Sequence, residues 1–242
     1  MVKQIWGNSQ FPIWNRRDGL KIHWLSAYAG SNPAAHIFLT MRELLIATKN
    51  QGKLDGLSYE LLSLPLNIVS LQNYLVDDST LIESGSTFEE NAELKAKFYA
   101  QKTKLMTLAD DSGLIVDALK DELGVKTRRW GAGEKASDSE WLDYFLRRME
   151  KENNRKALFV SCICLVNSQG KILFTAKGET YGILAREIQA PIKQGIPLSS
   201  VFIPDGCDKV HSAMSVEEKN KISHRGKAMR VIKAFLEEYL SS

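Results

Sequence analysis

The sequence predicts an α/β fold with a mixed β-sheet, on three observations. Short apolar segments typical of strands alternate with segments whose apolar residues recur at helical spacing. Two capping boxes, Thr87 to Glu90 and Ser137 to Glu140, mark the starts of helices. Late in the chain, two apolar segments flank Asn167-Ser168-Gln169-Gly170, which is a hairpin signal and makes at least one strand pair antiparallel.

The elements are expected in order from Met41, where regular periodicity starts. Residues 44–48 form a short apolar strand, and a polar loop over 49–53 leads into a helix that ends at about Leu64, before Pro65. The later elements are a strand over 67–71, the helix capped by Thr87, a strand over 105–109, the helix capped by Ser137, strands over 158–166 and 171–179, and a last helix capped by Ser223.

The first forty residues differ from the rest of the chain. They contain Trp6, Trp14 and Trp24 but no sustained helical or strand period. We therefore interpret residues 1–40 as an extension outside the fold and residues 41–242 as the folded domain. A basic, acid-poor leader is compatible with an organellar transit peptide, with vector-derived sequence or with upstream-translated sequence.

Composition and charge exclude several classes of function. With 44% hydrophobic and 25% charged residues, the 242-residue chain can bury a sizeable core. The formal net charge of +3 equals the balance of residues 1–40, so the remainder is neutral and no nucleic-acid-binding surface is expected. No apolar run approaches the roughly 18 residues of a membrane span. We expect a cytoplasmic protein without nucleic-acid or membrane partners, with Cys162 and Cys164 as buried thiols rather than metal ligands.

The segment Ala109-Asp110-Asp111-Ser112-Gly113 follows an apolar run, so its two carboxylates are expected where a strand gives way to a loop. Ligands of α/β folds bind at the tips of strands, and carboxylates there commonly hold a hard divalent cation against phosphate groups. A solvated turn is the alternative interpretation, because these residue types also favour turns.

Two further segments have the character of anion-binding helix starts. In the loop Thr48-Lys49-Asn50-Gln51-Gly52-Lys53, free backbone N–H groups and a lysine can face a phosphate, although the P-loop spacing is absent. His224 and Arg225 stand in the first turn of the last helix, where cations oppose the helix dipole and a bound anion would resolve the conflict. Polar turns are the alternative for both. Lys95 can reach the carboxylates of the next strand or extend into solvent.

Four blocks of the sequence together resemble one family. They are IATKNQGK (46–53), SGSTFEENAELKAK (84–97), LADDSGLIVDAL (108–119) and EEKNKISHRGKA (217–228). In the same order, they are similar to the non-canonical purine nucleoside triphosphate pyrophosphatases, also called the inosine triphosphatase family. The resemblance runs from Met41 to the end of the chain.

The resemblance implies an elongated mixed sheet flanked by helices, two lobes with a central cleft, and a homodimer. It implies Mg²⁺-dependent hydrolysis of nucleoside triphosphates, with inosine, deoxyinosine or xanthosine triphosphate as substrate, to a monophosphate and pyrophosphate. By position, Asp111 is the catalytic carboxylate and a metal ligand, Asp110 beside it is the second catalytic residue, and Glu83 is a second metal ligand. The expected substrate-binding residues are Thr48, Lys49, Asn50, Gln51, Gly52, Lys53, Lys95, Ser112, Leu198, Ser199, Lys219, His224 and Arg225.

Departures from the family pattern concern the metal and the base. Only Glu83 remains where the family carries a glutamate pair or near-pair, and the alternative is that the usual metal-ligand position falls on Ile82. The aromatic and acidic segment near the nucleobase is replaced by residues 196–200, Ile-Pro-Leu-Ser-Ser, and Arg128 stands at a position that is usually small. A pyrophosphatase for another or a modified nucleotide, and a nucleotide-binding protein without turnover, are therefore the alternatives.

Overall fold

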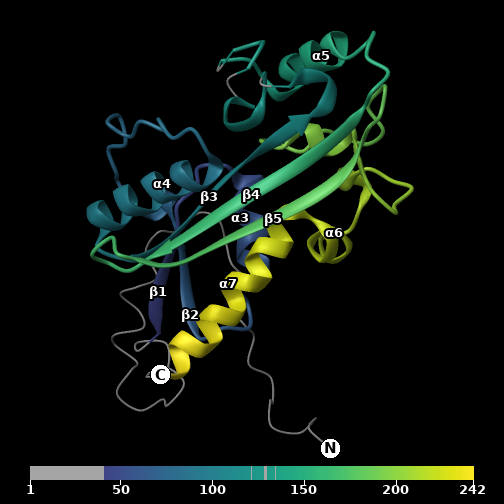
Figure 1. Ribbon diagram of the computed structural model, residues 1–242. Helices are drawn as coiled ribbons and strands as arrows, with labels where there is room; N and C mark the ends of the chain where they lie inside the picture. Colours follow the sequence, from purple (N-terminus) through teal and green to yellow (C-terminus); the bar gives the residue numbers. More distant parts are fainter. Residues whose placement is uncertain (1–40, 121, 128–129, 134) are drawn as a thin grey trace, which may run out of the picture. The chain divides into compact units, whose positions relative to one another are not determined.

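The computed structural model describes residues 41–120, 122–127, 130–133 and 135–242 (Figure 1). The predicted extension over 1–40 and the departure at Arg128 lie outside the described residues. None of the described helices is long and apolar enough to cross a membrane.

Six strands of the described chain form one mixed sheet, in the order β2-β1-β3-β4-β5-β6. Strand β1 pairs in parallel with β2 and β3, whereas β3, β4, β5 and β6 are successively antiparallel. This confirms the predicted α/β fold with a mixed sheet. The strand bounds are β1 Arg42–Ile46, β2 Leu66–Ser70, β3 Met106–Val116, β4 Lys156–Val166, β5 Ile172–Leu184 and β6 Phe202–Pro204.

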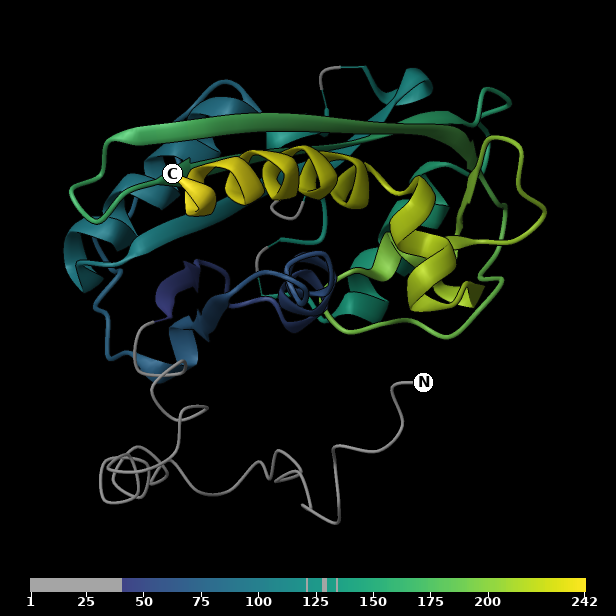
Figure 2. The ribbon, with the colours of Figure 1, turned by 90° about the horizontal axis from the view of Figure 1, so that it is seen from below.

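Helices cover both faces of this sheet (Figures 1 and 2). Helix α7 packs against β4 and β5 on one face, around a core that includes Ile163 and Ile232, and α4 packs on the opposite face around Ala96 and Cys162. A third cluster, around Trp141 of α5, joins the far end of β3 to the segment before β6. The helix bounds are α3 Gln51–Tyr59, α4 Phe88–Thr103, α5 Asp138–Arg148, α6 Val216–Ile222 and α7 His224–Ser241.

The predicted helix starts are confirmed by their capping contacts. Thr87 and Ser137 each form a capping box with the glutamate three residues later, and the Ser223 side chain accepts a hydrogen bond from the backbone N–H of Gly226. The hairpin is also confirmed, with Gly170 at a φ of 82°, a conformation that glycine adopts without steric cost. The first helix is shorter than predicted: it ends at Tyr59, and turns fill the residues up to Pro65.

Strand β3 is the main correction to the sequence-based expectation. It was expected over 105–109, with the two aspartates in a loop beyond its tip, but it continues to Val116. The physical reason is its antiparallel pairing with β4, which runs without interruption from Thr107 to Val116 and overrides the local turn preference of the Asp-Asp-Ser-Gly segment. Asp110 and Asp111 therefore lie within a strand.

Candidate active site

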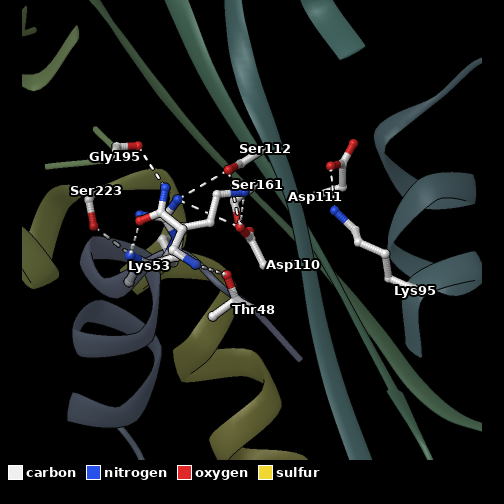
Figure 3. Close-up of polar contacts among 12 residues, drawn as sticks. Thr48, Lys53, Lys95, Asp110, Asp111, Ser112, Ser161, Gly195 and Ser223 are labelled. Carbon is white, nitrogen blue, oxygen red and sulfur yellow. Dashed lines mark hydrogen bonds and ion pairs between the residues drawn. The ribbon is translucent and has the colours of Figure 1, made fainter. Parts of the chain in front are cut away.

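Asp110 and Asp111 project from opposite faces of the sheet, because successive strand residues alternate between faces. Asp110 lies opposite Ile163, which belongs to the core under α7, whereas Asp111 lies opposite Cys162, which belongs to the core under α4. Figure 3 shows the two side chains on either side of the strand, each with its own lysine. The adjacent carboxylates thus form two separate ionic clusters.

On the α7 face, Asp110 holds two cations. Its Oδ2 lies 2.9 Å from Lys53 Nζ and 3.6 Å from Arg225 Nη2, and its Oδ1 accepts a hydrogen bond from Ser161 Oγ. Burial alone would raise the pKa of Asp110, but Lys53 and Arg225 outweigh it and hold that pKa far below its usual range. Asp110 is therefore a permanent anion that fixes the positions of both cations.

Ser112 extends this cluster along the same face of β3. Its Oγ donates to Asp110 Oδ2 at 3.1 Å and accepts a hydrogen bond from Arg225 Nη2 at 3.1 Å. Arg225 is buried, and its Nε atom has no hydrogen-bond partner among the described residues. The guanidinium is thus anchored at one nitrogen and retains an unused donor.

The loop before α3 is fixed by Asn50, the N-cap residue of that helix. The Asn50 side chain accepts from Lys53 N at 3.0 Å and donates to Gly195 O at 2.7 Å, which ties the loop to the segment before β6. The backbone of Asn50 donates to Thr48 Oγ1 at 3.1 Å. A Cβ atom on Gly52 would lie only 3.2 Å from the Ile196 side chain, so the glycine permits this close approach.

Two residues of the predicted phosphate loop point away from the cluster. The Lys49 ammonium is exposed and pairs with Asp78 at 2.6 Å. The exposed Gln51 side chain donates to Asp55 at 2.6 Å. The structure therefore brings Thr48, Asn50, Gly52 and Lys53 to the α7-face cluster, but not the side chains of Lys49 and Gln51.

On the α4 face, Asp111 pairs with Lys95. Lys95 Nζ lies 2.7 Å from Asp111 Oδ1 and 3.6 Å from Glu83 Oε1, so the two carboxylates converge on one nitrogen. Burial raises the pKa of Asp111, although Lys95 acts in the opposite direction. Glu83 is thus the acidic group of this segment that faces the cluster, whereas the neighbouring Ile82 is exposed. A cavity of about 670 Å³ lies beside it, lined by Glu83, Ser84, Gly85, Glu122, Val125, Lys126, Trp130 and Gly131.

The oxygen donors on this face fit a magnesium ion. Mg²⁺ is usually held by one or two carboxylates together with substrate phosphates and water, and Glu83 and Asp111 supply two. Within the described residues, no group of three or more His, Cys, Asp or Glu side chains could hold a metal ion.

The two clusters meet at an open edge of β3. Strand β1 pairs with β3 only as far as Leu108, and in the described chain no strand pairs with β3 on that side beyond this residue. Asp110, Asp111 and Ser112 follow after Ala109. The unpaired edge therefore lies between the cations of one face and the carboxylates of the other.

The start of α7 supplies a buried aromatic wall. The His224 ring stacks on Phe159 of β4 with ring centroids 4.7 Å apart, and its Nδ1 has no partner among the described residues. The backbone of His224 lies so close to Gly178 of β5 that a Cβ atom there would overlap its carbonyl oxygen. Nearby, the pKa of Lys219 is lowered to about 8, first by burial and then by the charges of Lys193 and Arg225.

The segment 197–200 forms a buried 3-10 turn whose serine hydroxyls form hydrogen bonds within the turn. Ser199 Oγ donates to Ile196 O at 2.7 Å, and Ser200 Oγ donates to Pro197 O at 2.8 Å. Leu198 packs into the third core cluster. Leu198 and Ser199 are both buried, and each hydroxyl of the turn donates its proton to a carbonyl within the turn.

Sequence analysis missed two residues that complete the cluster. Ser161, which lies opposite Ser112 in the β3–β4 register, bonds to Asp110, and Phe159 stacks on His224. Ser161 interrupts an otherwise apolar strand, which is the one signal that could have revealed it. Phe159 resembles any core aromatic in the sequence.

Cations on one face of a strand edge and two carboxylates on the other are the groups that enzymes acting on phosphates use. The chain belongs to the Ham1 family, whose model matches residues 44–235. A dITP/XTP pyrophosphatase of Staphylococcus epidermidis is 34% identical over 197 residues, which cover 81% of this chain and 97% of that protein. A dITP/XTP pyrophosphatase of Aquifex aeolicus is 37% identical over 78% of this chain and 93% of its own length.

Solved structures agree with the sequence relatives. A HAM1 protein from Coxiella burnetii is similar with a TM-score of 0.70 and 33% identity, over 82% of this chain and all of that one. The Ham1 protein of Staphylococcus aureus gives a TM-score of 0.68 and 32% identity over the same shares. These comparisons confirm the predicted family, fold class and assignment as a pyrophosphatase-type hydrolase.

Proposed function

We propose that this protein hydrolyses (deoxy)nucleoside triphosphates that carry non-canonical purines, such as dITP, ITP and XTP, to a monophosphate and pyrophosphate. The observation that carries the proposal is the open edge of β3, which places Lys53 and Arg225 on one face and Asp111, Lys95 and Glu83 on the other. A polyanionic chain along this edge meets Lys53 and Arg225 on one face, and on the other two carboxylates that can share a divalent cation with it. The printed activities of the relatives support the same substrates.

Each residue has a physical role in this proposal. Lys53 and Arg225, held by Asp110, neutralise phosphoryl oxygens, and Lys95 does so from the opposite face. Asp111, whose pKa is raised by burial, accepts the proton of the attacking water and orients it towards the α-phosphate. The base then lies towards His224. Ser161 contacts Asp110 of the phosphate cluster, and Phe159, which stacks on His224, lies two residues away on the same face of β4, about 7 Å along the strand.

Magnesium fits this arrangement on the α4 face. Glu83 and Asp111 would hold the ion, which when bound supplies positive charge that polarises the phosphoryl oxygens. Lys95 Nζ, which faces both carboxylates, holds them oriented towards the same point.

A substrate panel tests the proposal. The full chain is incubated with Mg²⁺ and with dITP, XTP, dATP, dGTP and pyrimidine triphosphates, and monophosphate and pyrophosphate are measured separately. We expect equal amounts of both products and a preference for dITP and XTP. Release of orthophosphate instead of pyrophosphate would contradict the reaction, and a preference for pyrimidine nucleotides would contradict the substrate class. The absence of turnover with every triphosphate would favour a binding protein.

The charge of Lys219 should give the reaction an alkaline limit. Because its pKa is lowered to about 8, the ammonium is charged below that pH and neutral above it. We expect kcat/KM to fall as the pH rises through about 8, since the neutral amine no longer attracts the substrate. The matched variant is Lys219→Arg, whose guanidinium stays charged and should remove this decline. An identical decline in both proteins would assign the limit to another group.

We also propose that residues 41–242 are the functional unit and that they form a homodimer. The functional unit is supported by the periodic pattern, which begins at Met41. The dimer is supported by an apolar surface: Ile115 and Tyr181 are exposed, and both align with Leu158 across the sheet. We expect a chain of residues 41–242 to keep its melting temperature and turnover, and to sediment as a dimer. Loss of folding or of most activity would show that residues 1–40 are an integral part.

A further inference from the structure

His211 is a buried histidine that belongs to none of the four family-like blocks. It begins a short 3-10 turn after β6 and is only 2% exposed. Its ring packs against Phe202 with centroids 5.1 Å apart, and it stacks on Phe159 and His224 at 6.0 Å and 6.3 Å. His211 therefore shares the aromatic wall of the candidate base site.

The Nε2 atom of His211 has no hydrogen-bond partner among the described residues. Buried polar atoms are nearly always paired, so an unpaired one beside a binding site indicates a ligand as its partner. The hydroxyls of Ser199 and Ser212, on the neighbouring turns, donate to the backbone carbonyls of Ile196 and Ser199. Within the described residues, the Nε2 atom of His211 and the Nδ1 atom of His224 are the unpaired polar atoms of this wall.

The charge state of His211 suits a hydrogen-bonding role. Burial, together with the charges of Lys219 and Arg225, lowers the pKa of His211 to about 3, so the ring is neutral at physiological pH. A neutral imidazole carries one N–H donor and one acceptor nitrogen. The influence of Lys219 and Arg225 also shows that His211 lies close to the cations that would bind the substrate.

We propose that His211 is a specificity-determining residue whose Nε2–H donates a hydrogen bond to the 6-oxo oxygen of a bound purine. This inference rests on the proposed function, and it supplies the polar contact that the apolar segment 196–198 cannot make. A 6-amino purine presents a donor at the same position and leaves the N–H unpaired. The site thereby favours inosine-type and xanthosine-type bases over adenine.

Two variants test this contact. His211→Phe keeps the aromatic packing and removes the nitrogen, whereas His211→Gln places an amide N–H near the former Nε2. For each we measure kcat and KM with dITP and with dATP. We expect His211→Phe to lower the preference for dITP over dATP, as a ratio of kcat/KM, by at least about tenfold, mainly through a higher KM for dITP. His211→Gln should retain most of the preference.

Controls separate this role from packing and from the proposed function. Ala213→Ser, on the exposed side of the same turn, should leave kcat/KM unchanged for both substrates. Melting curves should show that all variants fold. A parallel loss for dITP and dATP in His211→Phe, or an unchanged ratio, would overturn the inference. Calorimetric binding of dITP and dATP without Mg²⁺ is independent of turnover. If binding discriminates through His211 but no pyrophosphate forms, the proposed function fails and this inference stands.

Discussion

Replacing Asp111 by Asn should lower kcat by about 10²-fold or more while leaving the fold intact. The amide keeps the shape of the side chain but loses the charge and basicity that the metal and the attacking water require. Lys95 would still face Glu83, so the α4 face would keep one ion pair. The measurement is pyrophosphate release at saturating dITP, with a melting curve for each protein.

The control for this variant is Asp117→Asn, an exposed position just after the same strand. It should keep wild-type activity, because its side chain lies outside both ionic clusters. A kcat for Asp111→Asn above about a tenth of the wild-type value, which is a barrier change below about 1.4 kcal/mol, would contradict the assignment of Asp111 as the catalytic carboxylate.

Replacing Lys53 by Met should lower kcat/KM by about 10²-fold or more. The ammonium is largely shielded from solvent, lies 2.9 Å from Asp110 and is the cation that the phosphate loop brings to the α7 face. Its removal takes away one phosphate contact. Arg225 is then the remaining cationic partner of the buried Asp110 carboxylate, which draws the guanidinium towards it. Loss of one partner of a buried pair also destabilises a fold, typically by about 3–5 kcal/mol, so unfolding must be measured alongside activity.

Lys49→Met is a matched control in the same loop. Its exposed ammonium pairs with Asp78, away from the cluster, so we expect less than about a threefold change in kcat/KM. Equal losses in the two variants would show that the loop acts through its general positive charge. A large loss for Lys49→Met alone would reverse the assignment of the two lysines.

The sequence predicted the regular elements well where periodicity and capping agreed. The helices after Thr87 and Ser137 begin where their capping boxes place them, and the hairpin around Gly170 forms. Strand β3 was predicted too short, because the preference of Asp-Asp-Ser-Gly for turns is a local property, whereas its pairing with β4 depends on residues about fifty positions away.

The same limit applies to the site. The sequence identified Asp110, Asp111, Lys53 and Arg225, but adjacency along the chain suggested a single carboxylate pair. Only the strand geometry shows that the two aspartates serve different faces. His211 has no periodic or motif context in the sequence, so its place in the aromatic wall could be found only from the packed structure.

The contact between Gly178 and the start of α7 has a consequence for interpreting genetic variation in this protein. Since any side chain at this position would collide with the His224 backbone, every substitution at Gly178 displaces the residues that begin α7. In a map of mutational tolerance, Gly178 would therefore look as indispensable as Asp111, although it has no functional group. A harmful variant at this glycine would be a defect of geometry, and such a protein could be rescued by strengthening the fold, whereas one that lacks the carboxylate could not.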